Sequence, residues 1–248
     1  MDLLERAAQT IAHAKRGIAL TGAGISVESG IPDFRSADGL WSRYDPTEYA
    51  TISAFRRDPE KVWEMLREME ELVVNARPNP AHYALAKLEE VQILKAVITQ
   101  NIDNLHQMAG SKEVIEYHGN SATLSCLRCG MRYTREEKKG EKVPRCDCSM
   151  VLKPDVVFFG EPIPVDAMQR SFKLAASCDL LLIVGTSAVV SPANTIPGVA
   201  KQAGAKIIEV NLEPTHLTGS ITDIFVQGKA GEVLPKIVES LTKYLKGR

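Results

Sequence analysis

Short apolar runs alternate with segments of helical periodicity along the 248 residues of the chain. Continuous apolar runs, several of them rich in β-branched residues, predict buried strands at 17–20, 93–99, 114–117, 179–184, 205–210 and 224–226. Apolar residues at three- and four-residue steps predict helices at 2–16, from 58 up to Pro78, at 81–88 and at 232–246, with another after Asn194. This alternation favours an α/β fold with a doubly wound, parallel, Rossmann-like sheet.

Glycine and polar residues stand where these predicted strands end. Gly22 and Gly24 follow the first strand, residues 100–103 follow the strand at 93–99, and residues 185–187 follow the strand at 179–184. Parallel strands end at one edge of a sheet, and a glycine turn there lets backbone N–H groups approach a phosphate. The pattern predicts one ligand crevice. A complete dinucleotide fingerprint has a third glycine where this chain has Val27, so an ordinary tight turn also fits the first motif.

Two polar residues at the expected crevice each have a chemical and a structural interpretation. His118 precedes a glycine at the end of the strand at 114–117. An imidazole with a pKa near 6.5 suits proton transfer at neutral pH, but a lone histidine is more often structural. Asp103 is expected to be a ligand group, and the less favoured alternative is that Asp103 or Asn104 is a plain helix N-cap. Neither residue establishes a function by itself.

Four of the five cysteines gather in one short stretch, at Cys126, Cys129, Cys146 and Cys148. A C-x-x-C pair and a C-x-C pair offer four thiolates, which complete a closed tetrahedral site without an open position for water. The sequence therefore predicts one structural zinc ion in a module too small to bury a core of its own. A redox role is less favoured because no strand–helix redox pattern surrounds the cysteines.

Composition and charge argue against several classes of protein. The 30 Lys and Arg residues balance 31 Asp and Glu residues, and a net charge of −1 does not suit a general nucleic-acid binder. No apolar run reaches the roughly 18 residues of a membrane span, and the first residues do not resemble a signal peptide. We therefore expect a cytoplasmic protein without membrane or direct nucleic-acid binding.

The segment 36–80 departs from the strand–helix alternation. Aromatic residues in an irregular pattern at 36–57 predict a mobile loop. Asp58 then begins a helix as an N-cap, followed by a proline in the first turn. One face of that helix is apolar, and we interpret its residues as core: Val62, Met65, Leu66, Met69, Leu72 and Val73. The segment is therefore expected to be an insert.

Taken together and in order, the motifs resemble the sirtuin family of NAD-dependent protein-lysine deacylases. They are GAGISVESGIPDFR, TQNIDNLH, YHGN, the four-cysteine module, KPDVVFFGE, GTS and VNLEP. Their joint occurrence over residues 22–235 is far more specific than any single motif. The resemblance implies an NAD-binding Rossmann-like domain at 1–35, 81–120 and 155–248, a cofactor loop and helical insert at 36–80, and a zinc-binding module at 121–154.

The resemblance also implies roles for individual residues. His118 is the expected general base, and Asn101 is a second expected catalytic residue. The expected NAD contacts are Gly22, Ala23, Gly24, Val27, Phe34, Arg35, Gln100, Asn101, Ile102, Asp103, His118, Gly185, Thr186, Ser187, Asn211, Lys229 and Ala230. The expected substrate contacts, which would pair with an acylated peptide as an added strand, are Val157, Phe158, Phe159, Gly160 and Glu161.

The reaction implied by the resemblance is NAD-dependent deacetylation of an acetyl-lysine in a protein or peptide. The amide oxygen attacks the anomeric carbon of the nicotinamide ribose, and nicotinamide leaves. His118 then removes a proton from a ribose hydroxyl, which attacks the intermediate. The products are nicotinamide, O-acetyl-ADP-ribose and free lysine, and the zinc ion takes no part.

Two departures from the family pattern affect the expected selectivity and metal geometry. Family members that prefer succinyl and other acidic acyl groups carry Tyr and Arg three and six residues after the helix tryptophan. After Trp63 this chain has Leu66 and Met69 instead, so we expect a preference for uncharged acyl groups. The second cysteine pair is one residue shorter than the family's common spacing.

Two other functions fit the same motifs. Mono-ADP-ribosyl transfer to protein would use the same cleavage of NAD with a different acceptor. A non-catalytic sensor of NAD or ADP-ribose would dock through the zinc module, but the intact set of Gln100, Asn101, Asp103 and His118 argues against it.

Overall fold

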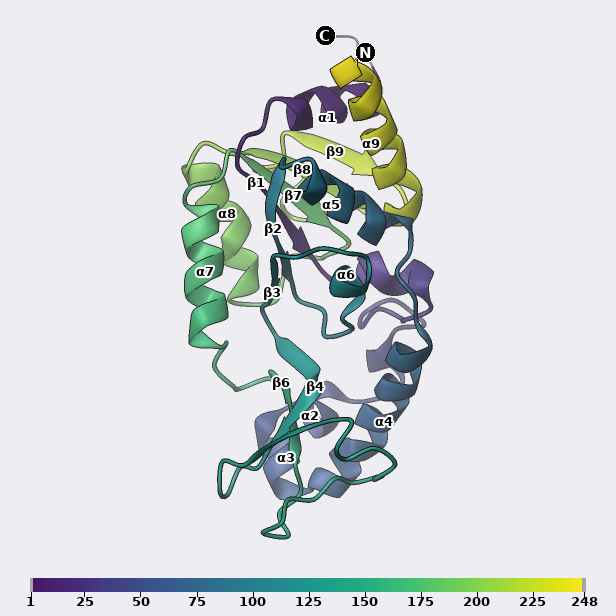
Figure 1. Ribbon diagram of the computed structural model, residues 1–248, viewed down its shortest axis with the longest axis vertical. Coiled ribbons are helices and arrows are strands. Elements are labelled where there is room, and N and C mark those ends of the chain that lie inside the picture. Colours follow the sequence, from purple (N-terminus) through teal and green to yellow (C-terminus); the bar gives the residue numbers. More distant parts are fainter. Residues whose placement is uncertain (1, 247–248) are drawn as a thin grey trace.

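Six parallel strands form the sheet of the larger lobe in the computed structural model, which describes residues 2–246 (Figure 1). The spatial order is β3-β2-β1-β7-β8-β9. The strands are β1 (Gly17–Thr21), β2 (Leu94–Thr99), β3 (Val114–Glu116), β7 (Leu180–Val184), β8 (Lys206–Asn211) and β9 (Ile224–Gln227). This is the Rossmann-like order, in which the chain reverses direction across the sheet between β1 and β7. The expected fold class is confirmed.

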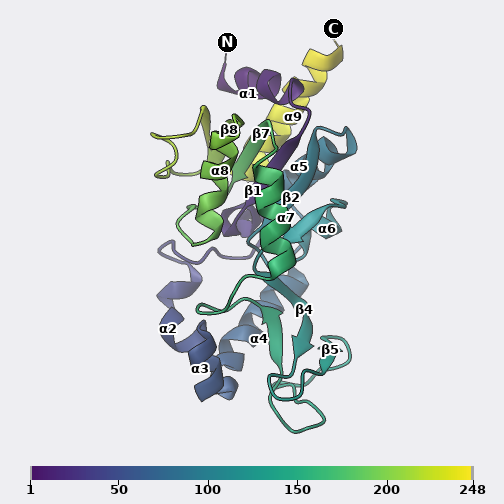
Figure 2. The same ribbon diagram turned by 90° about the vertical axis from the view of Figure 1, so that its left-hand side faces the viewer.

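Helices cover both faces of this sheet (Figures 1 and 2). One face packs against α1 (Leu3–Ala12), α5 (Pro80–Glu90) and α9 (Ala230–Lys246), and the other against α7 (Val165–Ala175) and α8 (Ile196–Gln202). Successive strand residues point to opposite faces, so Ala19 and Leu182 enter one core while Leu20 and Ile183 enter the other. Both β1 and β7 are buried along their whole length, which explains why they read as continuous apolar runs.

Two helices of the larger lobe differ from the expectation. The first ends at Ala12, before the predicted end at residue 16. The Asp179 carboxylate accepts hydrogen bonds from the backbone N–H groups of Lys15 and Arg16, both at 2.9 Å, and holds them in a turn that leads into β1. The second, α7, was not predicted, because its buried residues are Ala167, Ser171 and Ala175 rather than large apolar side chains.

The smaller lobe combines the insert with the cysteine module. Its antiparallel sheet has the order β5-β4-β6, from β4 (Gly119–Ser125), β5 (Arg132–Thr134) and β6 (Lys153–Val156). Its helices are α2 (Pro46–Tyr49), α3 (Ile52–Arg57) and α4 (Pro59–Asn75). A third apolar core joins these elements, and the indole N–H of Trp63 donates to the Leu152 carbonyl at 2.9 Å. Segments far apart in the sequence therefore stabilise each other here.

Part of the segment expected as a mobile loop is helical. Asp45 and Thr51 cap α2 and α3 through side-chain oxygens that accept from the N–H groups of Thr47 and Ala54. Asp58 caps α4 as predicted, by accepting from Lys61. The loop expectation was wrong for 46–57 because these short helices depend on packing against the third core more than on periodicity.

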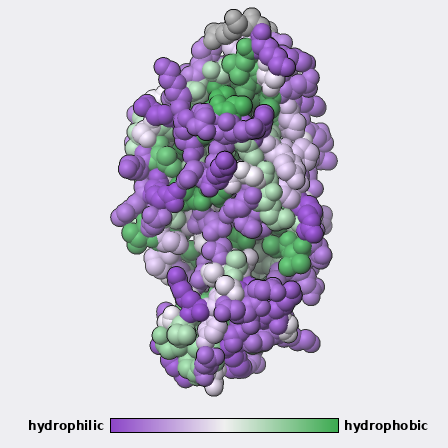
Figure 3. Space-filling model, in the orientation of Figure 1, coloured by the Kyte–Doolittle hydropathy of each residue, from purple (hydrophilic) through white to green (hydrophobic). Residues whose placement is uncertain are grey.

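Short elements complete the chain: the 3-10 segments η1 (Ala23–Ser29), η2 (Leu40–Ser42) and η3 (Ala193–Thr195), and the short helix α6 (Leu105–Met108). The face seen in Figure 3 is largely hydrophilic, with separate apolar patches. Within residues 2–246, no helix combines the length and apolar character needed to cross a membrane.

Candidate active site and metal centre

A cavity of about 810 Å³ lies at the carboxyl ends of the parallel strands and reaches the smaller lobe. Its wall includes every residue that the sequence assigned to NAD or to the substrate. These residues come from the turns after β1, β2, β3 and β7, from the end of β8, from the loop after η1, from the start of α9 and from the segment after β6. The fold therefore brings the predicted motifs together around one space, at the switch point where α/β sheets bind ligands.

The two glycine turns after β1 and β7 pack directly against each other. The Gly24 N–H donates to the Gly185 carbonyl at 2.8 Å, and a Cβ added at Gly24 would lie 2.8 Å from that oxygen. A Cβ at Gly22 would lie 2.7 Å from the Thr186 Cβ, and Gly185 has a φ of +60°. Side chains at these glycines would separate the turns. Val27, at the third fingerprint position, is 41% exposed and lines the cavity.

Asn101, Ser26 and Asp103 form a polar chain beside the first turn. Asn101 Nδ2 donates to Ser26 Oγ at 3.0 Å and to the Gly22 carbonyl at 3.2 Å. Ser26 Oγ donates to Asp103 Oδ2 at 2.7 Å. Asp103 Oδ1 also accepts from the Leu105 N–H at 3.0 Å, so the same carboxylate begins α6 and orders the cavity wall. The N-cap position itself is Asn104, whose side chain makes no capping bond, and the role of Asp103 as a ligand group stays a prediction.

Gln100 and Asn211 connect the ends of three strands. Gln100 Nε2 donates to Thr186 Oγ1 at 2.9 Å, and Asn211 Nδ2 donates to the Thr186 carbonyl at 2.8 Å. Thr186 is buried and belongs to the turn after β7. These hydrogen bonds connect the turn after β7 to the residue that follows β2 and to the end of β8.

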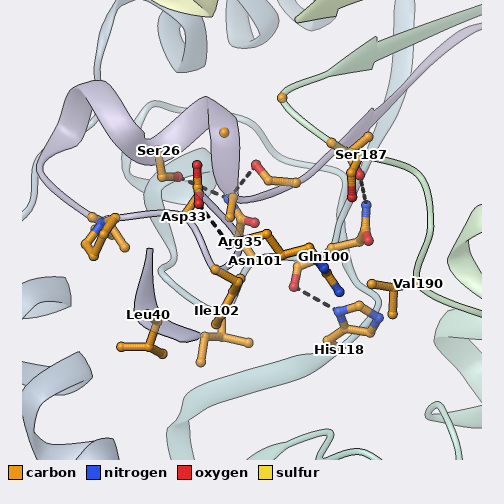
Figure 4. A pocket seen from close by; sticks show the side chains of 18 of the residues that line it. Ser26, Asp33, Arg35, Leu40, Gln100, Asn101, Ile102, His118, Ser187 and Val190 are labelled. Carbon is orange, nitrogen blue, oxygen red and sulfur yellow. Dashed lines mark hydrogen bonds between the residues drawn. The ribbon is translucent and has the colours of Figure 1, made fainter. Parts of the chain in front are cut away.

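His118 lies on the cavity wall with one ring nitrogen occupied (Figure 4). Its Nδ1 is 3.1 Å from the Gln100 carbonyl, which can only accept, so Nδ1 carries the proton. The Nε2 lone pair is then available as a base. Burial lowers the pKa of His118 below its ordinary 6.5, and the bond to the Gln100 carbonyl opposes this shift. The ring is therefore mostly neutral at pH 7, as proton abstraction requires.

Residues 157–161 line the cavity, but much of their backbone is already bonded. The Val157 N–H donates to the His118 carbonyl at 2.8 Å, and the Phe159 N–H donates to the Ala50 carbonyl at 2.8 Å. The Phe159 carbonyl accepts from Ile52 at 3.0 Å. A peptide added as a strand has to use other backbone groups of this segment.

Glu161 lines the cavity, but its carboxylate is bonded to residues of its own segment. It lies 3.0 Å from the Lys153 ammonium and accepts from the Phe158 N–H at 2.9 Å. The Lys153 side chain is only 7% exposed, and its ammonium also donates to the carbonyls of Pro154 and Val156 at 2.9 and 2.8 Å. This buried ion pair fixes the shape of the turn at 157–161.

Sequence reasoning missed several parts of the cavity wall, among them residues 212–215 after β8, part of α4 and a segment after β7. The α4 stripe, interpreted as core, does contain core residues such as Val62, but Met65, Leu66, Met69, Leu72 and Val73 also line the cavity. The segment Val190–Pro192 lines it as well. A signal was available for the segment Val190–Pro192, since it begins three residues after Ser187 of the Gly-Thr-Ser turn.

The four clustered cysteines form the expected metal site. Their sulfur atoms all lie within 4.8 Å of one another. The Cys126–Cys148 and Cys129–Cys146 sulfur pairs are each 3.5 Å apart. A tetrahedron of Zn–S bonds places its sulfurs about 3.8 Å apart, so the four thiolates fit zinc, and the short C-x-C pair does not prevent closure. The set leaves no position for a water ligand, which makes the site structural.

Comparison with known proteins gives a consistent result. The Sir2 family model matches residues 22–192. The NAD-dependent protein deacylase 2 of Archaeoglobus fulgidus is 51% identical over 249 residues, covering 98% of this chain and 97% of that protein. A solved Sir2 homologue–NAD complex has a TM-score of 0.91 and 46% identity, covering 99% of this chain and 95% of its own. The structure of Sir2Af2 bound to a myristoylated histone peptide has a TM-score of 0.85 and 42% identity, and the match covers 100% of this chain and 99% of that chain.

Proposed function

The chain belongs to the Sir2 family of NAD-dependent deacylases, and we propose that it is an NAD-dependent protein-lysine deacetylase. It transfers the acetyl group of an acetyl-lysine to ADP-ribose. Acetyl-lysine, NAD and one water molecule give free lysine, nicotinamide and O-acetyl-ADP-ribose. The observation that carries this proposal is the His118 ring, whose free Nε2 lies in the same cavity as both glycine turns and the segment 157–161.

We place NAD along the carboxyl ends of the strands. The turn at 22–24 approaches the diphosphate, and residues 100–103 surround the nicotinamide ribose. Residues 185–187, Asn211 and the start of α9 at Lys229 and Ala230 hold the adenosine half. Phe34 and Arg35 lie near the nicotinamide ribose on the loop that follows η1. All of these residues line the cavity, which supports the assignment.

The acylated peptide enters between residues 157–161 and Val190–Pro192, and its acyl-lysine reaches the nicotinamide ribose. The amide oxygen displaces nicotinamide at the anomeric carbon. His118 Nε2 accepts the proton of a ribose hydroxyl, and the resulting oxygen attacks the former amide carbon. The bond from this carbon to the lysine nitrogen then breaks and releases the amine, and one water molecule adds to the carbon, which leaves the acetyl group as an ester on ADP-ribose. Asn101 assists by orienting the ribose and any water held beside it. The apolar side chains of this part of the cavity exclude other water from the reacting centre.

The reaction is tested with an acetylated peptide, with and without NAD. We expect turnover only with NAD, and a mass spectrum with equal amounts of nicotinamide, O-acetyl-ADP-ribose and deacetylated peptide. Turnover without NAD would refute the mechanism. Labelled ADP-ribose attached to protein, with no O-acetyl-ADP-ribose in solution, would favour mono-ADP-ribosyl transfer instead.

The acyl group is expected to be uncharged. Leu66 and Met69 face the cavity on α4, where Met65, Leu72 and Val73 add further apolar surface. A succinyl carboxylate buried there would lack a cationic partner, which costs several kcal/mol. We therefore expect kcat/KM for acetyl and longer apolar acyl peptides to exceed that for succinyl peptide at least about a hundredfold. The myristoylated peptide on the Sir2Af2 structure supports the longer chains.

A charge placed at this position tests the selectivity directly. The double variant Leu66→Tyr with Met69→Arg should raise desuccinylation and lower deacylation of long apolar chains. Val74→Arg is the matched control, because Val74 is on the same helix, is 66% exposed and does not line the cavity. Desuccinylation by the wild type at the rate of deacetylation would contradict the prediction.

The same proposal divides the chain as the sequence suggested, with the NAD-binding domain at 1–35, 81–120 and 155–248, the insert at 36–80 and the zinc module at 121–154. The small sheet reaches slightly past the module's limits, from Gly119 to Val156. The cytoplasmic location and the absence of direct nucleic-acid binding stay predictions from composition.

A further inference from the structure

Glu209 is a fully buried carboxylate in β8, with an exposed fraction of 0%. Its neighbours Ile208 and Val210 belong to the core under α1, α5 and α9, so Glu209 points to the opposite face, with Ile207. Leu217 belongs to the core on that face, which brings the segment 212–222, after β8, over Glu209. A carboxylate without exposed surface requires hydrogen-bond donors close by.

Three threonine hydroxyls of the segment 212–222 supply those donors. Thr215 Oγ1 donates to one carboxylate oxygen at 2.6 Å, and Thr218 and Thr222 donate to the other at 2.7 and 2.9 Å. None of these partners is a cation. Asn211 Nδ2 approaches the first oxygen at 3.4 Å. The carboxylate thus gathers donors from both ends of one segment.

The hydroxyls also connect the carboxylate to the backbone of this segment. Thr215 Oγ1 accepts from the Leu217 N–H at 3.1 Å, and Thr218 Oγ1 accepts from the Thr215 N–H at 2.9 Å. A hydroxyl has one proton, and here that proton goes to Glu209 while the lone pairs hold the backbone. The position of the carboxylate therefore determines the conformation of residues 215–218.

This segment begins as a wall of the cavity. Asn211, Leu212, Glu213, Pro214 and Thr215 all line it, on the side that the proposed function gives to adenosine. We propose that Glu209 is a positioning residue for the adenosine half of NAD. It does not line the cavity itself, and it acts by holding residues 211–215 in the binding conformation before NAD arrives. This proposal rests on the proposed function.

Glu209→Gln in the full-length protein tests this role. The amide keeps the size of the side chain, but its NH₂ group cannot accept from the threonine hydroxyls. We expect the KM for NAD and the Kd for ADP-ribose to rise about tenfold, equal to roughly 1.4 kcal/mol. The kcat at saturating NAD and the KM for acetylated peptide should stay within about twofold of wild type.

Glu89→Gln is the matched control. Glu89 is also a buried glutamate, 9% exposed, but it accepts from the N–H groups of Lys112 and Glu113 and does not line the cavity. It should lower the unfolding temperature without changing the KM for NAD, because it supports structure only. If Glu209→Gln does not fold, Thr218→Val removes one donor and should raise that KM about threefold.

The outcomes separate this proposal from the one on which it rests. A wild type that neither turns over NAD nor binds ADP-ribose would refute both. An active wild type, with an unchanged KM for NAD in the folded Glu209 or Thr218 variant, would overturn the positioning role alone. A lower unfolding temperature with an unchanged KM would likewise leave Glu209 as a structural residue only.

Discussion

Replacing His118 by alanine is expected to lower kcat for deacetylation about a thousandfold, the usual contribution of a general base. The Nε2 lone pair is free on the cavity wall because Nδ1 is engaged by the Gln100 carbonyl. Alanine removes the base but leaves the glycine turns and the polar chain at Asn101 in place. The measurement is steady-state turnover of an acetylated peptide at saturating NAD, with unfolding temperatures recorded in parallel.

The same variant should retain the step that precedes proton abstraction. In the proposed reaction, nicotinamide leaves before His118 acts, so exchange of labelled nicotinamide into NAD in the presence of acetylated peptide should survive. His216→Ala is the control, because His216 is exposed and does not line the cavity. Loss of exchange together with turnover in a folded His118→Ala protein would contradict the assigned order of steps, and undiminished turnover would exclude His118 as the base.

The pH dependence follows from the direction of the His118 pKa shift. Burial lowers this pKa below 6.5, and the base must be neutral to accept a proton. Activity should therefore be highest at neutral pH and above, and should fall as the pH drops through the folded-state pKa, which lies below 6.5. A kcat/KM profile whose acidic limb is centred above pH 6.5 would contradict the buried environment seen here.

The strands and their polar ends could be predicted from the sequence because the physics is local. A strand covered by helices on both faces has to be apolar throughout, as β1 and β7 are. The glycines at 22, 24 and 185 are required because the turns after β1 and β7 pack too closely for a side chain at these positions. Residues that follow such strands meet at one edge of the sheet. The cavity residues that follow β1, β2 and β7 could therefore be predicted from the sequence alone.

The remaining features depend on which segments meet, and a linear pattern does not contain that. An apolar side chain looks the same whether it fills a core or lines a cavity, so the interpretation of α4 as core was incomplete at Met69 and Leu72. Helix α7 packs through alanine and serine, which do not stand out in an apolar pattern. The ion pair between Glu161 and Lys153 depends on the shape of the turn between them, which no sequence pattern indicates.

Loss of zinc is expected to destabilise the whole smaller lobe rather than the cysteine module alone. Cys126 and Cys146 are 3% and 4% exposed, and they belong to the same apolar core as Trp63 on α4 and Phe158 beside the cavity. The Phe55 and Phe158 rings stack with centroids 5.7 Å apart, which extends this core from α3 to the segment 157–161. Unfolding of the module would remove one side of that core.

Cys146→Ser is expected to lose the stoichiometric zinc and to lower the unfolding temperature by about 10 °C or more, since several kcal/mol of metal-dependent stability are lost. Cys178→Ser is the control, because Cys178 is buried in a different core and should keep one zinc per chain. Four thiolates leave the ion no open position, so activity should fall only in proportion to the folded fraction. Added zinc should restore neither the activity nor the folded fraction of the Cys146 variant. A folded, zinc-free variant with full thermal stability would show that the thiolates do not hold this lobe together. A folded, zinc-free variant of normal stability without activity would instead give the metal a role in the reaction.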